Sequence, residues 1–500
     1  MNQKQIDKLA KKYGFEIIQT HISWVLLSED KVYKIKKPVD FGFLDYTTID
    51  KRLEFCKKEV ELNRRLAEEI YEGISTINER DGELYIDEDG DVVDYAVRMK
   101  RMPQDRMMDV LIKNNLITDE EIEALAKKVA EFHKKAKTDD YISSFGSLET
   151  NKFNTDENFQ QTEDAIGEFI TQFQYESLKR FTDEFYKKNQ ELFDKRIKEK
   201  KIRDCHGDMY SRNICIVNKD RIFIYDCIEF NERFRYSDVA SDVAFLLMDL
   251  ENLERWDLSD KFLKSYLEYS SDESLNDVLG FYKIYRAYVR GKIAFFQNNK
   301  EEANKYFDLA FGYLPKEYKP KVLVFSGLSG SGKSTVALEL SKRYGFVVLS
   351  SDVIRKRLAG LSLNDKEMVS FGEGIYSMEM TKKTYSKMFE DAYQLVRIGK
   401  SVILDATFLR NSSRSAVERL FKRLGIKPVI VFFDIDDETA KKHFEKREKE
   451  NSISDGRFEI YLKQKEILEK PEDAITVDAN NSIEKIVDFI GGVLNDEVGR

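Results

Sequence analysis

Nine residues, GLSGSGKST at positions 327–335, have the types and spacing of a phosphate-binding loop. They match G-x-x-x-x-G-K-[ST] at every position, between an apolar run that predicts a strand and the helical pattern TVALELSKRYG. Glycines allow backbone N–H groups to converge on phosphate oxygens, while Lys333 would reach the β and γ phosphates and Ser334 would hold Mg²⁺. The motif therefore predicts a nucleoside triphosphate site. We expect nucleotide contacts from Gly327, Ser329, Gly330, Ser331, Gly332, Lys333, Ser334 and Thr335.

Charged residues after the next apolar runs have the chemistry of a phosphotransferase. Asp352 and Arg355 follow VVLS, at the sheet edge where nucleotides bind in doubly wound folds. Asp352 can accept the proton of an attacking hydroxyl and Arg355 can bind a substrate anion, and the alternative is that Asp352 only caps the next helix. Asp405, which ends SVILD, is a candidate Mg²⁺ partner or a structural residue. Arg447 is a candidate lid arginine on the transferred phosphoryl group, or part of a solvated basic face.

A second set with phosphotransferase spacing lies in HGDMYSRN and IYDCIEF. The first run matches H-x-D-x-x-x-x-N, a pattern in which the aspartate lies beside the acceptor hydroxyl and the asparagine binds metal. This predicts Asp208 as the base and Asn213 and Asp226 as Mg²⁺ ligands, with His206 as an architectural residue. A nucleotide-binding site without catalysis and a purely structural role are the alternatives.

The elements that must position these residues differ between the two parts of the chain. After Pro320, the runs VLVFSG, VVLSSD, SVILDAT and PVIVFFDI alternate with helical patterns, which predicts an α/β domain with a doubly wound parallel sheet. Before Pro315, strand-like alternation with one amphipathic helix at 51–68 gives way to mostly helical periodicity. The two prolines favour a boundary near residue 317. We predict an α+β two-lobed domain at 1–317, with lobes 1–103 and 104–312, and an α/β domain at 318–500.

The HGD segment, with its asparagine five residues after the aspartate, resembles the aminoglycoside phosphotransferase branch of the protein-kinase-like fold. The resemblance covers about residues 15–310. It implies that Lys34 in KVYKIKK pairs the α and β phosphates and that Glu59 is its partner on a helix, with Lys36 as an alternative to Lys34. It also implies that Glu229 assists metal binding.

The same resemblance implies an adenine-binding hinge at 97–102, with Met99 and Met102 among its contacts, and structural roles for Asp238 and Asp242. The sequence departs from the protein-kinase pattern between the first strands. THISW stands where a GxGxxG loop would cover the phosphates, so another loop would have to do so.

The C-terminal part, about residues 320–494, resembles the P-loop kinases related to polynucleotide kinase, chloramphenicol phosphotransferase and zeta toxin. GLSGSGKST, SSDVIR and ILDAT carry this resemblance, which implies a hydroxyl acceptor with Asp352 as base. THISW, VYKIKKPVDFGFLD, DCIEFN and AYVRGK extend the likeness to nearly the whole chain. The whole chain resembles a bacterial and archaeal family that joins an aminoglycoside phosphotransferase-like domain to an AAA-family or P-loop ATPase.

Composition excludes several other classes of protein. Lys plus Arg total 82 and Asp plus Glu total 91, so the net charge is −9 and broad nucleic-acid binding through net charge is disfavoured. Four cysteines without a CxxC pair point to a reducing cytosol, and Cys205, Cys215 and Cys227 do not have zinc-site spacing. The apolar runs are far shorter than the roughly 18 residues of a membrane span, so we expect a cytoplasmic protein without a membrane partner.

Together these features predict a bifunctional, ATP- and Mg²⁺-dependent phosphotransferase with a separate site in each part. Its acceptors would be hydroxyl-bearing small molecules or nucleotides that the motifs do not identify, and the sequence leaves the oligomeric state open. One alternative is a regulatory ATP-binding protein or ATPase with one degenerate kinase site. A second, not favoured, is a 5′-hydroxyl nucleic-acid kinase whose basic groove would use Lys356, Arg357, Arg410 and Arg414.

Overall fold

A computed structural model describes residues 1–42, 44–362, 374–449 and 458–496. Its internal contacts divide the chain into two units, Met1–Gln160 with Glu184–Val289, and Gln161–Asp183 with Arg290–Arg500. Helices α7 (Gln172–Lys188) and α12 (Leu275–Phe296) therefore contribute residues to both units. The predicted boundary near residue 317 stays a prediction. Among the described residues, no helix combines the length and the apolarity that crossing a membrane requires.

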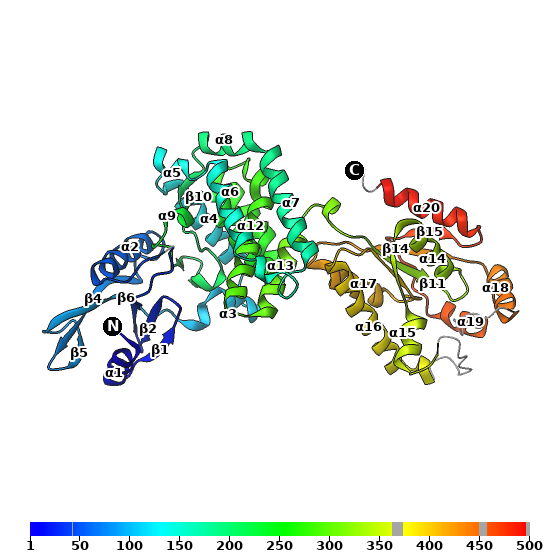
Figure 1. The fold of residues 1–500 in the computed structure, drawn as a ribbon, viewed down its shortest axis with the longest axis horizontal. Coiled ribbons are helices and arrows are strands. Elements are labelled where there is room, and N and C mark those ends of the chain that lie inside the picture. The colour runs from blue at the N-terminus through cyan, green and yellow to red at the C-terminus, as the bar shows by residue number, and fades with distance from the viewer. Residues whose placement is uncertain (43, 363–373, 450–457, 497–500) are drawn as a thin grey trace. The chain divides into compact units, whose positions relative to one another are not determined.

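The first unit begins with a six-stranded antiparallel sheet in the order β1-β2-β3-β6-β4-β5 (Figure 1). Its elements are α1 (Gln3–Tyr13), β1 (Glu16–Gln19), β2 (Ser23–Leu27), β3 (Lys31–Lys36), α2 (Ile49–Ala67), β4 (Tyr71–Arg80), β5 (Glu83–Ile86) and β6 (Asp91–Lys100). Consecutive residues of a strand point to opposite faces, so Ala96 packs in a core with α1 whereas Val97 packs in a core with α2. The predicted strands and amphipathic helix are present, and the protein-kinase-like fold stays a prediction.

Strand periodicity also decides where the candidate lysines lie. Ile35 of β3 is buried in the core shared with α1, so Lys34 and Lys36 lie on the other face, which α2 covers. Helix α2 starts at the N-cap Thr48, whose side chain accepts a hydrogen bond from the Lys51 N–H, and it carries Glu59 toward that face. The sheet and α2 thus bring both lysines to the same glutamate.

The rest of the first unit is mainly helical. Its helices are η1 (Gln104–Arg106), α3 (Met108–Lys113), α4 (Asp119–Lys135), α5 (Asp140–Ser144), α6 (Leu148–Gln160), α8 (Gln190–Lys198), η3 (Ser211–Asn213), α9 (Glu232–Arg235), α10 (Val239–Asn252) and α11 (Trp256–Ser270). Its strands are β7 (Ile202–Asp204), β8 (Ile214–Asn218), β9 (Arg221–Ile224) and β10 (Tyr236–Asp238). Strand β7 pairs with β10, and β8 pairs with β9. The HGD segment follows β7 in the chain, and Asp226 follows β9.

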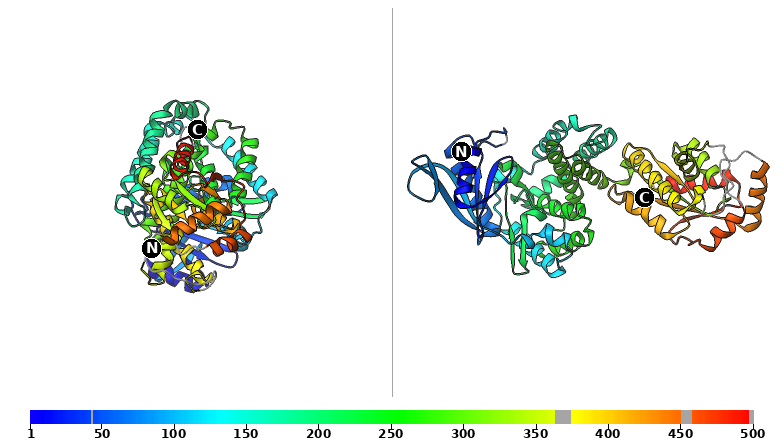
Figure 2. Two further views of the ribbon diagram at one scale, coloured as in Figure 1. Left: turned by 90° about the vertical axis from the view of Figure 1, so that its right-hand side faces the viewer. Right: turned by 90° about the horizontal axis from the view of Figure 1, so that it is seen from below.

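The second unit contains a five-stranded parallel sheet in the order β12-β13-β11-β14-β15, which confirms the predicted parallel sheet. Its strands are β11 (Val322–Gly327), β12 (Val347–Ser350), β13 (Val402–Asp405), β14 (Val429–Asp434) and β15 (Ile475–Asp478). Its helices are η2 (Glu163–Ala165), α13 (Lys300–Gly312), η4 (Lys316–Tyr318), α14 (Lys333–Tyr344), α15 (Ser351–Leu358), η5 (Gly374–Tyr376), α16 (Met378–Arg397), α17 (Asn411–Lys422), α18 (Asp437–Lys449), α19 (Phe458–Glu466) and α20 (Ile483–Asp496), with the adjoining parts of α7 and α12. Figure 1 shows α14 and α20 on one face of the sheet and α16 and α17 on the other, and the view from below in Figure 2 agrees.

The register of this sheet brings separate motifs to one edge. Asp405 at the end of β13 is paired with Phe325 of β11 on one side and with Ser350 of β12 on the other. The phosphate-binding loop follows β11 and α15 follows β12. Because the carboxyl ends of parallel strands lie at the same edge, the loop, Asp352 and Asp405 become neighbours.

Helix α16 is held at its C-terminal end by a buried aspartate of α13. The carboxylate of Asp308 accepts hydrogen bonds from Tyr393 Oη at 2.6 Å and from Arg397 Nε at 2.8 Å, both on α16. It also accepts one at 2.7 Å from Nε2 of Gln174 on α7. Thr171 Oγ1 donates to the backbone oxygen of Arg397 at 2.6 Å. Two separate segments of the second unit, 161–183 and the stretch that contains α13, therefore fix α16.

Candidate active sites

The phosphate-binding loop has a backbone that only glycine adopts easily. Gly327, Gly330 and Gly332 have φ values of 142°, 89° and 82°. A Cβ on Gly327 would lie 2.7 Å from the Phe433 backbone oxygen, and one on Gly330 would lie 2.8 Å from the Phe444 ring. The loop can therefore keep its curvature and its packing only with glycine at these positions.

Lys333 begins α14 and its side chain folds back over the loop. Its Nζ donates hydrogen bonds to the backbone oxygens of Gly327 and Leu328, at 3.0 and 2.7 Å, and to Ser331 Oγ at 3.2 Å. The residue is only 7% exposed. This arrangement places a positive charge at the concave side of the loop, where the motif predicts the β and γ phosphates. Thr335 follows in the first turn of α14 and is exposed.

Ser334 and Asp405 meet at the end of the sheet. Ser334 Oγ donates a 2.7 Å hydrogen bond to Asp405 Oδ2, and Asp405 is only 4% exposed. A hydroxyl and a carboxylate supply the hard oxygen donors that Mg²⁺ prefers. The two residues thus fit the predicted metal site beside the phosphates.

Asp352 and Arg355 form an ion pair in the first turns of α15, with Arg355 Nη1 2.9 Å from Asp352 Oδ1. The N-cap position of α15 belongs to Ser350, and Asp352 lies inside the helix. The capping role that the sequence left open for Asp352 therefore does not apply. Its carboxylate instead lines the same cavity as Lys333.

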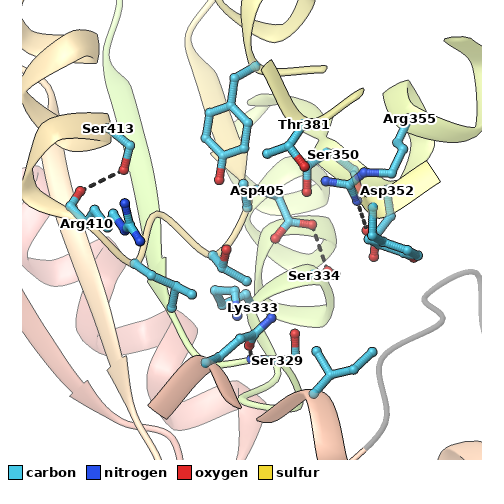
Figure 3. Close-up of a pocket in the computed structure, with 18 of the residues that line it drawn as sticks. Ser329, Lys333, Ser334, Ser350, Asp352, Arg355, Thr381, Asp405, Arg410 and Ser413 are labelled. Carbon is cyan, nitrogen blue, oxygen red and sulfur yellow. Dashed lines mark hydrogen bonds and ion pairs between the residues drawn. The ribbon is translucent and has the colours of Figure 1, made fainter. Parts of the chain in front are cut away.

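This cavity has a volume of about 540 Å³, within the range of small-molecule sites. It brings together most of the predicted C-terminal site residues: Ser329, Gly330, Gly332, Lys333, Ser334, Asp352, Arg355 and Asp405. Figure 3 shows Asp352 and Arg355 on one side of it and Arg410 and Ser413 on the opposite side. Arg447 belongs to α18, but its side chain lies outside the described part of the chain.

The basic groove required by the nucleic-acid alternative is not formed by the four residues proposed for it. Lys356 is 1% exposed and Arg414 is 3% exposed. Arg414 donates to the backbone oxygens of Phe408 and Glu469, at 2.5 and 2.7 Å, so its charge stabilises a turn inside the domain. The expectation that Lys356 and Arg414 contribute to a surface groove is therefore wrong.

Two loop contacts were missed by sequence reasoning. His443 Nδ1 lies 2.7 Å from the backbone oxygen of Gly330, and the Ser329 N–H donates to Gln464 Oε1 at 2.9 Å. The histidine and the glutamine come from α18 and α19, more than 100 residues after the loop. A single histidine and a single glutamine outside any motif give no local signal of such contacts.

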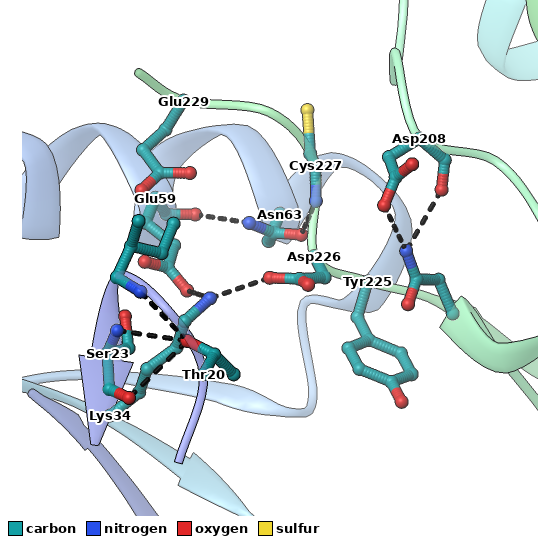
Figure 4. A network of polar contacts seen from close by, with 12 residues as sticks. Thr20, Ser23, Lys34, Glu59, Asn63, Asp208, Tyr225, Asp226, Cys227 and Glu229 are labelled. Carbon is teal, nitrogen blue, oxygen red and sulfur yellow. Dashed lines mark hydrogen bonds and ion pairs between the residues drawn. The ribbon is translucent and has the colours of Figure 1, made fainter. Parts of the chain in front are cut away.

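In the first unit, Lys34 joins two predicted site residues (Figure 4). Its Nζ lies 2.9 Å from Glu59 Oε1 and 2.6 Å from Asp226 Oδ1. Burial disfavours the charged form of Lys34 and by itself would lower its pKa. The negative charges of Asp226 and Glu59 have the larger combined effect, so the pKa of Lys34 is well above its usual value. Asp226 has a left-handed backbone, with φ of 62°. This conformation is uncommon outside glycine and is often found at functional sites.

Lys36 binds the other oxygen of the same glutamate. Its Nζ lies 2.7 Å from Glu59 Oε2 and also pairs with Glu229, which accepts a 2.7 Å hydrogen bond from Tyr46 Oη. Lys36 is fully buried, whereas the Lys34 side chain is 14% exposed and reaches Asp226. Burial opposes ionisation of Glu59, yet the two lysines lower its pKa to about 2. The structure thus gives both lysines a role and places Lys34 beside the predicted metal ligand.

Asp208 and Asn213 are held together across one turn. Asn213 Nδ2 donates to the backbone oxygen and to Oδ2 of Asp208, both at 3.0 Å. The backbone of the HGD segment is fixed by Asp242, whose carboxylate accepts the N–H groups of His206 and Gly207 at 2.7 and 2.9 Å. Figure 4 shows Asp208 beyond Asp226 as seen from Lys34. Asp208, Asn213 and Asp226 supply oxygen ligands of the kind that Mg²⁺ prefers.

His206 is buried, and its Nδ1 accepts the N–H of Asp208 at 3.3 Å, while its architectural role stays a prediction. Burial lowers its pKa to about 4, so the imidazole is neutral at pH 7. Within the described residues, one group of metal-binding types gathers: His133, Cys205 and Asp242. Asp242 already accepts two backbone N–H groups, and His133 is also bonded to Tyr266 Oη at 2.9 Å. Cys205 Sγ donates to the Ser237 backbone oxygen at 3.3 Å, so each of the three residues already has a hydrogen-bond partner.

The predicted hinge residues lie where β6 ends. Met99 is paired with Val32 of β3 and is 8% exposed, and Met102 packs against the same core as α2. THISW covers the turn after β1 and the first two residues of β2, and Thr20 Oγ1 accepts the N–H of Ser23 at 2.9 Å. A compact polar turn therefore stands in the place of a glycine-rich loop.

Comparison with known proteins matches the C-terminal part to a family model described as "AAA domain", over residues 322–471. Cytidylate kinase of Methanocella arvoryzae is 30% identical over 112 residues, which cover 21% of this chain and 64% of that protein. The gluconokinase structure from Sinorhizobium meliloti is 18% identical, with 34% of this chain and 88% of that chain covered and a TM-score of 0.25. A Mycobacterium tuberculosis APS kinase CysC in complex with AMPPNP and APS is 20% identical, with 35% and 98% covered and a TM-score of 0.27.

Longer relatives span both units. The uncharacterized protein Rv2004c of Mycobacterium tuberculosis and the uncharacterized protein Mb2027c of Mycobacterium bovis are each 31% identical over 411 residues, which cover 81% of this chain and 80% of theirs. The similarity therefore extends well beyond the AAA domain. The chain belongs to the same protein family as Rv2004c, and the AAA domain at residues 322–471 is one part of this chain.

Proposed function

We propose that the protein is an ATP- and Mg²⁺-dependent phosphotransferase with two separate sites, each transferring the γ-phosphoryl group to a hydroxyl. The observation that carries the proposal is the arrangement around the C-terminal cavity. Lys333, the Ser334–Asp405 pair and the Asp352–Arg355 pair all line it. The similarity to cytidylate kinase over part of this domain supports the same reaction type.

At the C-terminal site, the oxygen of the acceptor hydroxyl attacks the γ phosphorus of ATP. The new O–P bond forms as the bond to the β-phosphate oxygen breaks, and ADP leaves. Asp352 accepts the proton of the hydroxyl, while Lys333 stabilises the charge on the phosphates. Ser334 and Asp405 would hold Mg²⁺, which neutralises phosphate charge when bound.

At the N-terminal site, Asp208 would accept the hydroxyl proton and Lys34 would bind the α and β phosphates. Lys34 and Lys36 face Glu59, Asp226 and Glu229, so the paired groups alone leave one surplus negative charge. Asp208 adds another carboxylate nearby. A net negative cluster with Asn213 and Asp226 as oxygen donors suits a divalent cation.

The second candidate function is regulatory, with an N-terminal site that binds ATP without catalysis. The observation in its favour is the THISW segment between β1 and β2, which stands where a glycine-rich loop would cover the phosphates.

Calorimetric titration of the full chain with a non-hydrolysable ATP analogue and Mg²⁺ tests the two-site proposal. We expect two nucleotides per chain, falling to one in Asp226→Ala. At ligand concentrations too low to fill a weakened P-loop, Lys333→Ala should also bind one. A wild-type stoichiometry of one, lost only in Lys333→Ala, would remove the N-terminal site from the proposal.

Catalysis at the C-terminal site is tested by Asp352→Asn. This variant should bind ATP normally, but transfer to an acceptor should slow by about 10² to 10⁴, the usual contribution of a general base. The regulatory alternative instead predicts that Asp208→Asn has no effect on any transfer reaction of the protein. Equal turnover by wild type and Asp352→Asn would contradict the assigned base.

A further inference from the structure

Arg355 presents an unused hydrogen-bonding edge inside the C-terminal cavity. The residue is 7% exposed, and its Nη1 donates to Asp352 at 2.9 Å. Its Nε is buried and bonds to none of the described residues, among which Asp352 is the one hydrogen-bond partner of the guanidinium. A buried donor without an acceptor costs free energy, because the hydrogen bond that it would make to water is not replaced. A ligand that reaches this donor would recover that free energy.

The geometry of a guanidinium decides what such a ligand must be. Nε and Nη2 carry parallel N–H groups on one edge, which match the two oxygens of a carboxylate, phosphate or sulfate group. The pair with Asp352 uses Nη1 and leaves this edge available. The Arg355 guanidinium carbon also lies 4.7 Å from the centre of the Tyr376 ring, so an aromatic face supports the plane of the fork.

The charges around the cavity agree with an anionic ligand. Its lining contains the cations Lys333, Arg355, Lys382 and Arg410 and the carboxylates Asp352 and Asp405. Both carboxylates are engaged, by Arg355 and by Ser334. Lys333 belongs to the nucleotide loop, while Lys382 and Arg410 are exposed and form no ion pair with a described residue. Beyond the nucleotide, the cavity therefore has more positive than negative charge.

We propose that the acceptor of the C-terminal site is a small molecule with both a hydroxyl and an oxyanion group, and that the Nε/Nη2 edge of Arg355 binds the oxyanion. This inference rests on the phosphotransferase function proposed above. The ion pair would then position the acceptor, because Asp352 and Arg355 are linked and the hydroxyl would lie beside Asp352 when the anion lies on Arg355. Neutral polyols lack the group that this edge requires.

Binding of inorganic phosphate to the full chain tests the Arg355 site without any acceptor turnover. Equilibrium dialysis with labelled phosphate is done with Mg²⁺ and saturating β,γ-imido ATP, so that the nucleotide sites are filled. Arg355→Gln and Arg355→Lys should each weaken phosphate binding roughly tenfold to hundredfold, the loss expected for a charge-assisted contact. Arg355→Lys keeps the charge and removes the edge. Unchanged β,γ-imido ATP affinity shows that both variants fold.

Arg343→Gln and Arg343→Lys are the matched controls. Arg343 also pairs with an aspartate, Asp488 at 2.6 Å, but it lies on α14 and does not line the cavity. These controls should bind phosphate as the wild type does. Equal phosphate affinity in Arg355→Lys and wild type would overturn the proposal, as would an equal loss in the Arg343 variants.

The second experiment compares three acceptors that share one carbon skeleton and differ in their oxyanion group: glycerol, glycerate and glycerol 3-phosphate. ATP-dependent transfer to glycerate or glycerol 3-phosphate should exceed that to glycerol at least tenfold, and the preferred member identifies the oxyanion. Equal transfer to glycerol would overturn the inference. If no member is phosphorylated but phosphate binding depends on Arg355, the oxyanion site stands and the proposed function is what fails.

Discussion

Lys34 and Lys36 bind the two oxygens of one carboxylate, that of Glu59, at 2.9 and 2.7 Å. The two lysines are two residues apart on β3 and point to the same face, but each has a different second partner. Lys34 extends to Asp226 at the predicted metal site, while the fully buried Lys36 extends to Glu229. We therefore expect substitutions of the two lysines to have different consequences.

Lys36→Met should destabilise the first unit by about 3 to 5 kcal/mol, because it leaves Glu229 and one oxygen of Glu59 buried without a counter-charge. Both tryptophans of the chain, Trp24 and Trp256, lie in this unit, so urea unfolding followed by tryptophan fluorescence reports on it. Lys58→Met removes an exposed pair with Glu54 and should cost less than about 1 kcal/mol. Similar losses in the two variants would contradict the buried-pair argument.

Lys34→Met should instead weaken ATP binding at the N-terminal site roughly tenfold to hundredfold, through loss of a charge-assisted phosphate contact. The measurement is calorimetry on the full chain in a Lys333→Ala background, at nucleotide concentrations too low to fill the weakened P-loop. Lys31→Met, on the same strand, is the control and should keep the affinity. If both variants bind ATP equally, Lys34 is not the phosphate lysine.

Asp405→Asn should reduce the Mg²⁺ dependence of nucleotide binding at the P-loop. An amide keeps the shape and can still bond to Ser334, but it lacks the negative charge that holds the cation. In an Asp226→Ala background, we expect ATP affinity with Mg²⁺ to fall about tenfold to hundredfold, and affinity with EDTA to change little. A loss of the same size in EDTA would mean that Asp405 supports the loop and not the metal.

The stability of the first unit should fall in mild acid because of His206. Burial lowers its pKa from about 6.5 to about 4, so between these values the unfolded chain binds a proton that the folded chain does not. Stability is therefore lost as pH falls through this window, by up to about 1.4 kcal/mol per pH unit and about 3 kcal/mol in all. Urea unfolding of His206→Gln should show a flatter pH dependence than wild type. The exposed His21→Gln should match wild type, and parallel curves for His206→Gln would refute the assignment.

Local patterns in the sequence were sufficient to predict the loop, the strands that end at Asp405 and Ser350, and the parallel arrangement. The strand order required pairing between distant segments. We missed β4, where Gly73 and several polar residues interrupt the alternation, and β15, which has only four residues. Short strands give little periodic signal, and their burial depends on neighbours that the local sequence does not reveal.

The candidate sites show a similar division. Motif spacing selected Asp208, Asn213 and Asp226, because each position is defined relative to the others. The resemblance favoured Lys34 but left Lys36 as an alternative, since side chains two residues apart on a strand share a face. The free edge of Arg355 was also beyond prediction from sequence, because it depends on which nitrogen Asp352 occupies.

The hydrogen bonds around Asp308 bear on how this chain can be recombined during evolution. The aspartate lies on α13 and Gln174 on α7, yet both bond within the unit that contains the P-loop. A gene exchange at the prolines near residue 317 would carry Tyr393 and Arg397 away from Asp308, and Gln174 would be left behind. The part of the chain after residue 317 therefore lacks some of the residues that fix α16. We expect related chains to inherit α7, α13 and α16 together, with changes at Asp308 matched by changes at Arg397.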